Sequence, residues 1–493
     1  MKRLFFLFFA FSLFLCSCAE TELYQDEGFA PVDTSFSTES QENAKNDVFS
    51  VAFCSSESAD PYTSSNKINF ELMGLITEPL FSVSDTFEVT PVLCSDYKCH
   101  GKVHTFTIKE GVSFSDGSPV KASDVKASIL GAAEPSSYYA TRLSVVESVV
   151  SDNRRRTVTV TLKYENELFP ALLDFPIIKE GTRKNLLPVG TGIYAPDKEA
   201  TVLTARENHH SGNTPLYETI NLCNTNASDE LLFNFNNLNV SVFTTDPTGT
   251  SPQLPSLSVD TINIITTNMH YIGFNTRNPQ LASKSIRQAI ARAIDRKSIA
   301  ESDFALMGEA SCLPLHPYVS YYPSEQETGL EFESELKIES DEPLTILVNS
   351  ENGAKLSACN RIAEALTAKG IPTTVRALPF EEYTASLQNG DFTLYYAEVS
   401  LGADFDITRI IEGSLNFGGF SDPSLKSALS AYLAAPEESI NAYVDAFCDT
   451  VPFAPIFFKK TAMYTQKNFF TATYPTSQNI YHRFCDWKIK GGN

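Results

Sequence analysis

The chain has 493 residues, a length that corresponds to about three structural units. Hydrophobic residues make up 42% of it and aromatic residues 11%, so most of the chain is expected to fold around buried cores. Its 60 Asp and Glu outnumber its 38 Lys and Arg and give a net charge of −22. A field of this sign repels phosphate backbones, so nucleic acid is excluded as an expected partner.

The N-terminus predicts export. Lys2 and Arg3 precede an uncharged apolar run from Leu4 to Leu15, too short for a transmembrane helix, which needs about 20 residues. Cys18, with Ser17 before it and Leu15 three places before it, resembles the acylated Cys of a bacterial lipobox. We expect residues 1–18 to be a lipoprotein signal peptide, with lipidated Cys18 as the membrane anchor; an ordinary cleaved signal is the alternative. Residues 19–46 are polar and acidic, which predicts a disordered tether.

The first half of the folded part reads as short strands with two helices. Period-two patterns, turn dipeptides and capping residues predict a strand at 48–53, a helix at 67–81, a strand at 104–108, a turn at 111–117, a helix from Val125 capped by Ser123 or Asp124, and a strand at 157–162. The stretch 185–239 mixes short strands and loops.

The second half alternates strands with helices. A long helix is expected at 283–300, followed by strands at 344–348, 373–378 and 392–399 with helices at 354–369 and 381–388 between them. This order implies right-handed crossovers and a parallel sheet. The fold class is therefore α/β.

Eight cysteines follow the export signal. An even number permits disulfides in an oxidising compartment, but the pairing cannot be read from the sequence. Cys94 and Cys99 are close enough in sequence for a small loop. The chain has no Cys-x-x-Cys pair, which leaves a zinc ribbon without support.

Catalytic and metal-binding motifs are weak. There is no Gly-x-Ser-x-Gly elbow and no His-Glu-x-x-His helix. Adjacent His209 and His210 lack further ligands in sequence and are predicted to lie on a solvated loop, so we expect no metal and no cofactor. Gly190-Thr191-Gly192 has no following helix and predicts a tight turn rather than a phosphate cradle.

Six sequence segments, in a fixed order along the chain, are more informative about function than these motifs. They are His104–Val120 with Ala122–Val125, Pro188–Tyr194, Phe274–Thr276 with Ile286–Arg296, Gly390–Phe405, Asn416–Pro423 and Pro452–Phe457. Together they resemble the family 5 extracytoplasmic solute-binding proteins, the oligopeptide- and dipeptide-binding components of bacterial ABC importers. Residues 200–260 match this pattern poorly, and Ile193 stands where Pro is usual.

The resemblance implies a two-lobed periplasmic binding-protein fold, cluster C-like, with an inserted subdomain in its first lobe. Its boundaries would be 47–61, 180–265 and 465–493 for lobe I, 62–179 for the inserted subdomain and 266–464 for lobe II. Chain crossings near 265 and 465 would form a hinge, and closure around a ligand would be a population shift.

The resemblance also implies a ligand site. In peptide-binding members the Asp of an Ala-Asp-Phe/Tyr element accepts the ligand's α-ammonium, and the match here is Ala403-Asp404-Phe405. A carboxylate enclosed in a cleft would hold any peptide through a charge-assisted hydrogen bond. Edges at 54–58 and 398–402 would add main-chain pairing. The predicted ligand-binding residues are Ser55, Ser56, Ser58, Glu398, Ser400, Leu401, Gly402, Ala403, Asp404 and Phe405.

Two positions depart from the family pattern. Leu401 stands where peptide binders commonly have Trp, and Glu398 stands where some members have a basic residue. An added acid would favour cationic ligands or disfavour a ligand carboxylate. Because the family also contains members that bind glutathione, haem, sugars or nickel complexes, a non-peptide solute is the alternative ligand.

The expected protein is a non-enzymatic, periplasmic, membrane-anchored monomer. It would pass a short peptide or related solute to an ABC permease that works with a separate ATPase. Two rival interpretations are a surface lipoprotein that acts as an adhesin or sensor, and a periplasmic hydrolase that uses Asp404 and Asp406.

Overall fold

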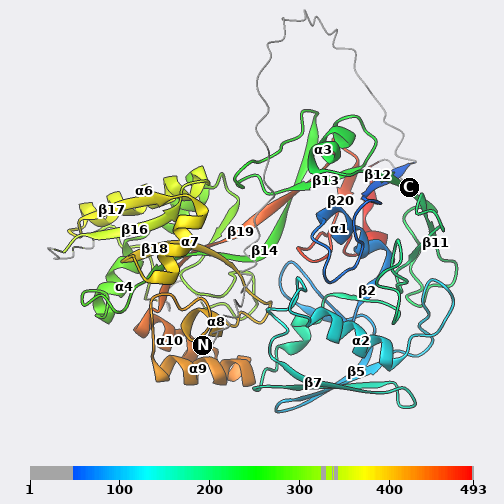
Figure 1. Cartoon of the computed structure of the whole chain (residues 1–493), viewed down its shortest axis with the longest axis horizontal. Helices are drawn as coiled ribbons and strands as arrows, with labels where there is room; N and C mark the ends of the chain where they lie inside the picture. Colours follow the sequence, from blue (N-terminus) through cyan, green and yellow to red (C-terminus); the bar gives the residue numbers. More distant parts are fainter. Residues whose placement is uncertain (1–47, 324–328, 336, 338–341, 491–493) are drawn as a thin grey trace, which may run out of the picture. The chain divides into compact units, whose positions relative to one another are not determined.

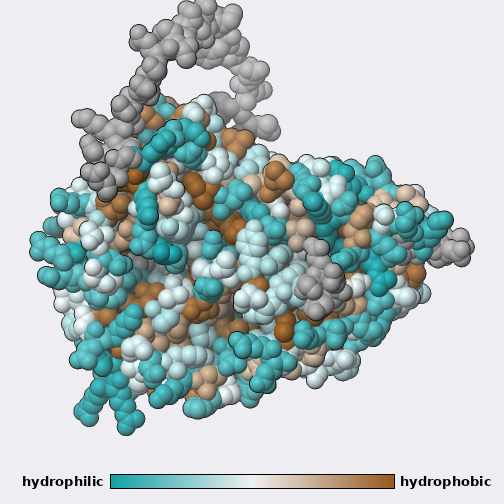
Figure 2. Space-filling model, turned by 180° about the vertical axis from the view of Figure 1, so that it is seen from behind, coloured by the Kyte–Doolittle hydropathy of each residue, from teal (hydrophilic) through white to brown (hydrophobic). Residues whose placement is uncertain are grey.

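The structure is a computed structural model that describes residues 48–323, 329–335, 337 and 342–490. The predicted signal peptide, Cys18 and the tether lie outside these residues. Within the described ranges, no helix has the length and apolar character needed to cross a membrane. Figure 2 shows one face of the molecule, on which hydrophobic residues form small separate patches between hydrophilic ones.

The first strand of the described chain belongs to a four-stranded sheet with the order β1-β12-β11-β10. Its strands β11 and β12 are labelled in Figure 1. Its strands are β1 (Phe49–Phe53), β10 (Tyr194–Pro196), β11 (Val202–Ala205) and β12 (Thr219–Asn224). β1 runs parallel to β12 and is an edge strand. Its alternate residues Phe49, Val51 and Phe53 are buried, which confirms the strand that the period-two pattern predicts.

Helix α1 (Lys67–Ile76) packs into the core of this sheet and ends earlier than predicted. The expected helix at 67–81 is wrong beyond Ile76, because Thr77 is already extended. Glu78 precedes Pro79, and the proline ring disfavours helical geometry at the residue before it. The chain continues instead into β2 (Glu78–Pro79).

A second four-stranded sheet has the order β5-β6-β8-β7 and is antiparallel throughout. Its strands are β5 (Cys94–His100), β6 (Val103–Ile108), β7 (Val146–Asp152) and β8 (Thr157–Leu162). Helix α2 (Ala122–Ala132) covers it and begins three residues before the predicted Val125. Asp124 sits in the first turn, where it accepts the backbone N–H of Lys121 at 2.9 Å, instead of preceding the helix.

The largest sheet has seven strands, with β13-β19-β14-β18-β16-β17 in order and β15 paired to β19. The strands are β13 (Val242–Thr245), β14 (Val259–Phe274), β15 (Gly308–Ala310), β16 (Leu344–Asn349), β17 (Thr373–Leu378), β18 (Leu394–Ser400) and β19 (Phe453–Gln466). As predicted, β16, β17 and β18 are parallel, joined by α6 (Gly353–Ala368) and α7 (Phe380–Asn389), whose ribbons lie beside them in Figure 1. β14 and β19 pair antiparallel, so the whole sheet is mixed.

The predicted helix at 283–300 is interrupted. α4 (Lys284–Ala293) ends before Ile294, whose backbone is extended. Asp295 then caps a new short helix, α5 (Arg296–Ser298), by accepting the N–H of Ser298 at 3.0 Å. The remaining elements are β3 (Phe81–Val83), β4 (Val89–Pro91), β9 (Pro176–Ile177), α3 (Ser228–Asn236), α8 (Thr408–Ile411), α9 (Pro423–Ala434), α10 (Pro436–Thr450), β20 (Phe470–Ala472) and β21 (Lys488–Ile489).

Strands β14 and β19 are shared between two cores. Ile264 and Met463 pack with the first sheet, whereas Met269 and Phe458 pack with the core of the seven-stranded sheet. The register of this strand pair is irregular between Ile265 and Met269. The irregularity lies where the sequence predicts the crossing near 265, and Ile265 faces Lys460 rather than a residue at 465.

The eight described cysteines are free thiols, so the small loop considered for Cys94 and Cys99 does not form. Both lie on β5, and five residues of extended strand span about 16 Å. A disulfide requires Cα atoms within about 7 Å. The strand geometry therefore keeps the two thiols apart.

Arg287 on α4 is buried and bonded only to main chain. Its guanidinium donates to the carbonyl oxygens of Leu281, Ala282, Thr450 and Val451, at 2.5 to 3.0 Å. Two of these carbonyls end α10, where helix geometry leaves oxygens without a partner. Arg287 thus joins the end of one helix to the start of another.

Replacing Arg287 by Lys should destabilise the fold. A single ammonium cannot span four carbonyls, and each buried oxygen left without a donor costs about 1–3 kcal/mol. We expect Arg287→Lys to lower the free energy of unfolding in urea by roughly 2–4 kcal/mol. Arg292→Lys is the matched control, because Arg292 is half-buried and its side chain bonds one carbonyl, that of Gly329. Equal losses in the two variants would contradict this role.

Candidate functional site

The segment that follows β18 forms a tight, buried turn. The N–H of Leu401 donates to the carbonyl of Thr267 at 3.1 Å, and the Thr267 hydroxyl donates to the Leu401 carbonyl at 2.7 Å. At Gly402 a Cβ would lie 2.4 Å from Oδ1 of Asp404 and 2.8 Å from the side chain of Leu172. A side chain at position 402 would therefore have to displace the side chains of Asp404 and Leu172.

Phe405 completes the turn and fixes its orientation. It has a left-handed backbone with φ 53°, an unusual conformation for a residue with a side chain. Its buried ring packs edge-on against Phe87, at 5.1 Å between centroids, and against Phe458, at 5.9 Å. Because Phe405 is held on both sides, Asp404 points inward and is only 4% exposed.

The Asp404 carboxylate is buried without a cation. Its Oδ2 accepts the side-chain amide of Asn166 at 2.8 Å, and its Oδ1 accepts the N–H of Asp406 at 3.4 Å. No Lys, Arg or His among the described residues forms an ion pair with it. Burial, and then the charge of Asp406, raises the pKa of Asp404 to about 7.

The neighbouring Asp406 is satisfied by hydroxyl groups. Tyr164 donates to its Oδ2 at 2.7 Å, and Thr408 donates its N–H and hydroxyl to Oδ1 at 2.8 and 2.5 Å. Tyr164 and Asn166 thus come from one segment after β8, and the N–H of Glu167 in the same segment donates to the carbonyl of Leu433 at 2.7 Å. This segment could not be predicted from the sequence, because nothing in its local pattern signals a contact 238 residues away.

Glu398 has charged partners of its own. It forms ion pairs with Lys355, at 2.9 Å, with Lys459, and with His270, at 3.5 Å. Burial acts to raise the pKa of Glu398, but these three groups together hold it well below its ordinary range. Since burial lowers the pKa of His270 to about 4, the two lysines carry the compensating charge at neutral pH. Glu398 is therefore not the free extra acid that the sequence suggests.

The serine turn after β1 is largely occupied by internal bonds. The Ser55 hydroxyl donates to Asn224 at 2.7 Å, the Ser56 hydroxyl donates to Asn226 at 3.2 Å, and Ser58 accepts a backbone N–H. Asn69 bonds the Cys54 N–H and the carbonyls of Cys54, Glu57 and Ser58. Within the part of the chain that the structure describes, no hydrogen bond or ion pair links the side chains of this turn to residues 398–405. Asn69 and Asn224 thus hold the main chain of this turn at Cys54, Ser55, Glu57 and Ser58.

Strand β18 is longer than its ladder with β16. The pairing with β16 stops at Tyr395, whereas the strand continues to Ser400, paired only with β14. Residues 396–400 therefore have one strand edge outside the β16 ladder, and the Tyr383 hydroxyl donates to the Tyr396 carbonyl at 2.7 Å. The edge expected at 398–402 includes the last residues of this strand and stays a prediction.

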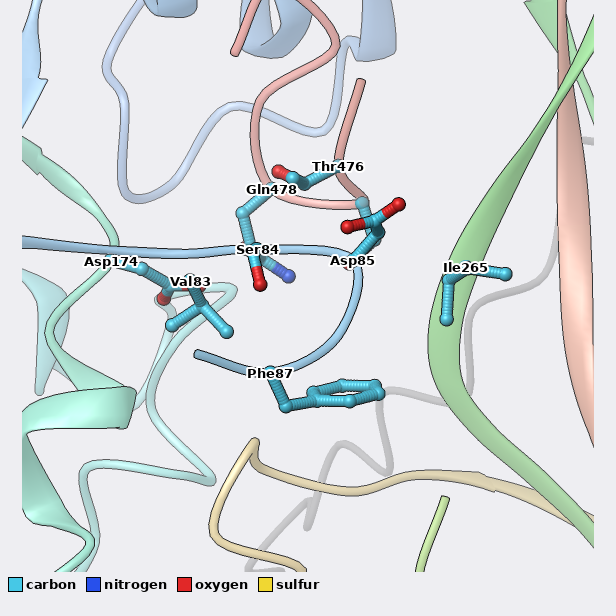
Figure 3. Close-up of a pocket in the computed structure, with 9 residues that line it drawn as sticks. Val83, Ser84, Asp85, Phe87, Asp174, Ile265, Thr476 and Gln478 are labelled. Atoms are coloured by element: carbon cyan, nitrogen blue, oxygen red, sulfur yellow. The ribbon is translucent and has the colours of Figure 1, made fainter. Parts of the chain in front are cut away.

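A cavity of about 20 Å³ lies close to the turn, with room for about one water molecule. Val83, Ser84, Asp85, Phe87, Asp174, Ile265, Thr476, Ser477 and Gln478 line it (Figure 3). Phe87 connects this cavity to Phe405 through the ring contact described above. Asp174 is paired with Arg142 at 2.5 Å, and burial raises its pKa. The space is too small for a peptide in this conformation.

The two adjacent histidines are not solvated, which corrects the sequence interpretation. The side chains of His209 and His210 are 4% and 11% exposed, and both imidazoles face the carboxylate of Glu78. The Gly190–Gly192 turn packs against the chain just before Glu78, where a Cβ at Gly190 would lie 2.2 Å from the Ile76 carbonyl. Sequence reasoning missed Glu78 because it lies 132 residues from His210.

A family match is found for most of the chain. The sequence profile of the bacterial extracellular solute-binding proteins, family 5 (middle region), matches residues 88–408. The chain belongs to this family. This confirms the resemblance carried by the six sequence blocks and, with the structural comparisons, the two-lobed α/β fold class; the domain boundaries stay predictions.

Sequence relatives cover a smaller part. The glutathione-binding protein GsiB of Salmonella typhi is 28% identical over 149 residues, and that of Escherichia coli K12 is 26% identical over 151 residues. Each match covers 29% of the relative, and 27% or 28% of this chain. The chain therefore matches less than a third of the length of these curated relatives.

Solved structures match nearly the whole chain. The murein tripeptide binding protein MppA, in its unliganded open form, has a TM-score of 0.68 at 16% identity and covers 86% of this chain and 94% of its own. HbpA2 from Haemophilus parasuis has a TM-score of 0.69 at 17% identity, with 88% and 97% covered. AppA from Bacillus subtilis, in complex with a nonapeptide, has a TM-score of 0.56 at 16% identity, with 90% and 98% covered. At these identities the likeness establishes the fold.

Neutralising Asp404 should stabilise the ligand-free protein at high pH. A folded-state pKa near 7, against about 3.9 when unfolded, means that the folded protein holds a proton that the unfolded chain releases. Stability is thus fully present below pH 4 and falls as pH rises to 7, by roughly 3–4 kcal/mol. We expect Asp404→Asn to unfold at higher urea than wild type at pH 8, with the gap closing towards pH 4.

Asp391→Asn serves as control, because Asp391 is an exposed partner of Arg376 and its loss should leave the pH dependence unchanged. Parallel stability curves for wild type and Asp404→Asn between pH 4 and 8 would show that the carboxylate is already compensated.

Proposed function

We propose that this chain is the ligand-binding component of an ABC importer and captures short peptides, with Asp404 receiving the ligand's α-ammonium. The observation that carries this proposal is the buried Asp404 carboxylate, which has an amide donor from Asn166 but no cation. A charge in this position is costly unless a partner neutralises it. A ligand ammonium supplies that partner.

The exchange of donors has a simple physical basis. An ammonium has three N–H donors and a full charge, so it attracts a carboxylate more strongly than a neutral amide does. To reach Asp404, the ligand has to displace Asn166 or share the carboxylate with it. Because Tyr164 and Glu167 dock beside it, access requires the whole segment 164–167 to move away. Opening and closing of this contact would then be linked to ligand binding.

The edge of β18 suits a ligand that is bound through its main chain, whatever its side chains are. An extended ligand can pair its main chain with residues 396–400, beyond the point where β16 stops pairing. Main-chain pairing and an ammonium anchor are available to every peptide. Support also comes from the structural neighbours, since one is in complex with a nonapeptide and another is described as a murein tripeptide binding protein.

A second ligand class is favoured by the sequence relatives, which are described as glutathione-binding proteins. Glutathione is itself a short peptide with one free α-ammonium, so the same carboxylate can anchor it. Glutathione is therefore the first defined ligand to test beside simple peptides. Delivery to a permease, and action as a periplasmic monomer, belong to the same proposal.

Peptide binding should depend on the charge pair. We expect Asp404→Asn to weaken the binding of an unmodified tripeptide by about 2–5 kcal/mol in calorimetric titration, because the ammonium loses a buried partner. N-acetylation of the same peptide should have a similar cost in the wild type. Asp391→Asn is the matched control, with an acid removed from an exposed pair. Equal affinity for free and acetylated peptides would remove Asp404 from the site.

The affinity should also depend on pH in a definite direction. The bound carboxylate is ionised, whereas the free one has a pKa of about 7, so below pH 7 the ligand competes with a proton. Affinity should fall by up to about tenfold for each unit of pH below 7, and this slope should be absent in Asp404→Asn. A wild-type affinity that stays constant between pH 5 and 7 would contradict the proposal.

The anchor is proposed from Cys18 alone. A Cys18→Ser chain expressed in a bacterium should lose incorporation of labelled fatty acid and appear in the soluble periplasmic fraction. Cys16→Ser is the matched control and should stay acylated, because bulky Leu15 directly precedes Cys16. Acylation retained in Cys18→Ser would refute this assignment.

A further inference from the structure

Three side chains from two distant segments meet near the first sheet. Glu78 lies on β2, and His209 and His210 lie in the connection between β11 and β12. Nε2 of His210 is 2.6 Å and Nε2 of His209 is 3.6 Å from the same carboxylate oxygen of Glu78. One donor atom from each of the three residues lies within 4.8 Å of the other two.

The surrounding chain holds both segments in place. The N–H of Gly192 donates to the Ile76 carbonyl at 3.0 Å, two residues before Glu78. Arg206 donates to the carbonyls of Thr191 and Gly192 at 2.8 and 3.0 Å, three residues before His209. The Gly-Thr-Gly turn is thus bonded to the segments on both sides of the cluster, and the donors are set by the fold rather than by chance contact of loose loops.

The cluster is partly enclosed. The side chains of Glu78, His209 and His210 are 17%, 4% and 11% exposed. A carboxylate and two imidazoles are ligand types that zinc binds in proteins.

We propose that Glu78, His209 and His210 form a binding site for a divalent zinc ion. Two imidazoles and one carboxylate are a common three-residue set for zinc, with a fourth position left to water. Metal–ligand bonds of about 2.0–2.1 Å place tetrahedral donors about 3.3–3.5 Å apart, close to the observed 2.6 and 3.6 Å. To bind the ion, His209 has to give up the hydrogen bond from its Nε2 to the Thr191 carbonyl, which is 2.9 Å long. The exposed part of Glu78 provides a route for the ion.

The zinc ion would have a structural effect that is separate from peptide capture. It would tie β2, directly after α1, to the connection before β12, and so brace the first sheet. Asp404 and its partners Asn166 and Asp406 are not among the donors. The proposal therefore stands or falls independently of the peptide site.

The test is a zinc titration of the purified chain after treatment with a chelator, against a chromophoric competitor. Wild type should bind one zinc ion at this site, and Glu78→Gln and His210→Ala should each weaken it by at least about 100-fold. His100→Ala is the matched control, because His100 is an exposed histidine on β5 outside the cluster. Asp404→Asn should bind zinc as the wild type does, which separates this result from the proposed peptide function.

A second measurement covers variants that fold poorly. Cobalt in place of zinc should give the intense visible bands of a four-coordinate ion in wild type, and His209→Ala should lose them while its circular dichroism stays native. Zinc should also raise the midpoint of thermal unfolding in wild type but not in Glu78→Gln. Unchanged affinity in both Glu78→Gln and His210→Ala, or binding no tighter than in a denatured sample, would overturn the proposal.

Discussion

The arrangement around residues 400–406 depends on one unfavourable fact, a carboxylate enclosed without a cation. Asp404 is held inward by the left-handed Phe405 and by Gly402, which lets Leu172 approach. The fold thus maintains a position in which ionisation is opposed by burial and by Asp406. Strain of this kind persists only where the surrounding structure is rigid enough to impose it, and a site that receives an external cation is a natural place for it.

Glu398 is an acid whose charge is compensated by cationic side chains of the same chain. It lies on β18, six residues before Asp404, and is partly buried, with Lys355 and Lys459 against it. Its pKa is depressed, whereas that of Asp404 is raised. The contrast between two neighbouring acids argues that the missing partner of Asp404 is a specific feature of the site rather than a general consequence of an acidic chain.

The fold relates the proposed binding of a ligand at Asp404 to movement between two cores. Asp404 belongs to the core of β14, β18 and β19, while Asn166 follows β8 and belongs with the second sheet. β14 and β19 pass from one core to another, and their pairing is irregular between Ile265 and Met269. A paired two-strand connection resists twisting along most of its length and bends most easily at such an irregularity. In the proposed opening, the contact of Asn166 with Asp404 would be broken.

Local patterns in the sequence predict the elements well where period and capping act alone. These patterns predict the alternation in β1, the three parallel strands and the helices between them. The prediction fails where a backbone preference competes, as at Pro79, which ends α1, and at Ile294, which interrupts α4. Asp404 could be singled out because it falls in a recognisable block.

Its partner Asn166 could not be found in this way, and neither could Glu78, because each meets its counterpart across more than a hundred residues. Such pairs depend on register and packing between sheets, which no local period encodes. The adjacent histidines illustrate the consequence. Judged by their own segment they lie on a polar loop, but the close packing of Gly190 and Gly192 against the end of α1 brings a carboxylate to them.

Asp404 and Glu78 thus represent two solutions to the same electrostatic problem. Glu78 is met by two imidazoles, whose nitrogens are of a type that binds metal ions. Asp404 is met by an amide, which carries no charge, so only a proton or a cation from outside the chain can neutralise it. Under the two proposals, imidazole partners suit a lasting structural link, whereas an amide partner suits a contact that is given up when a ligand enters. The kind of nitrogen beside each acid, more than the burial of the acid, therefore distinguishes the two proposed sites.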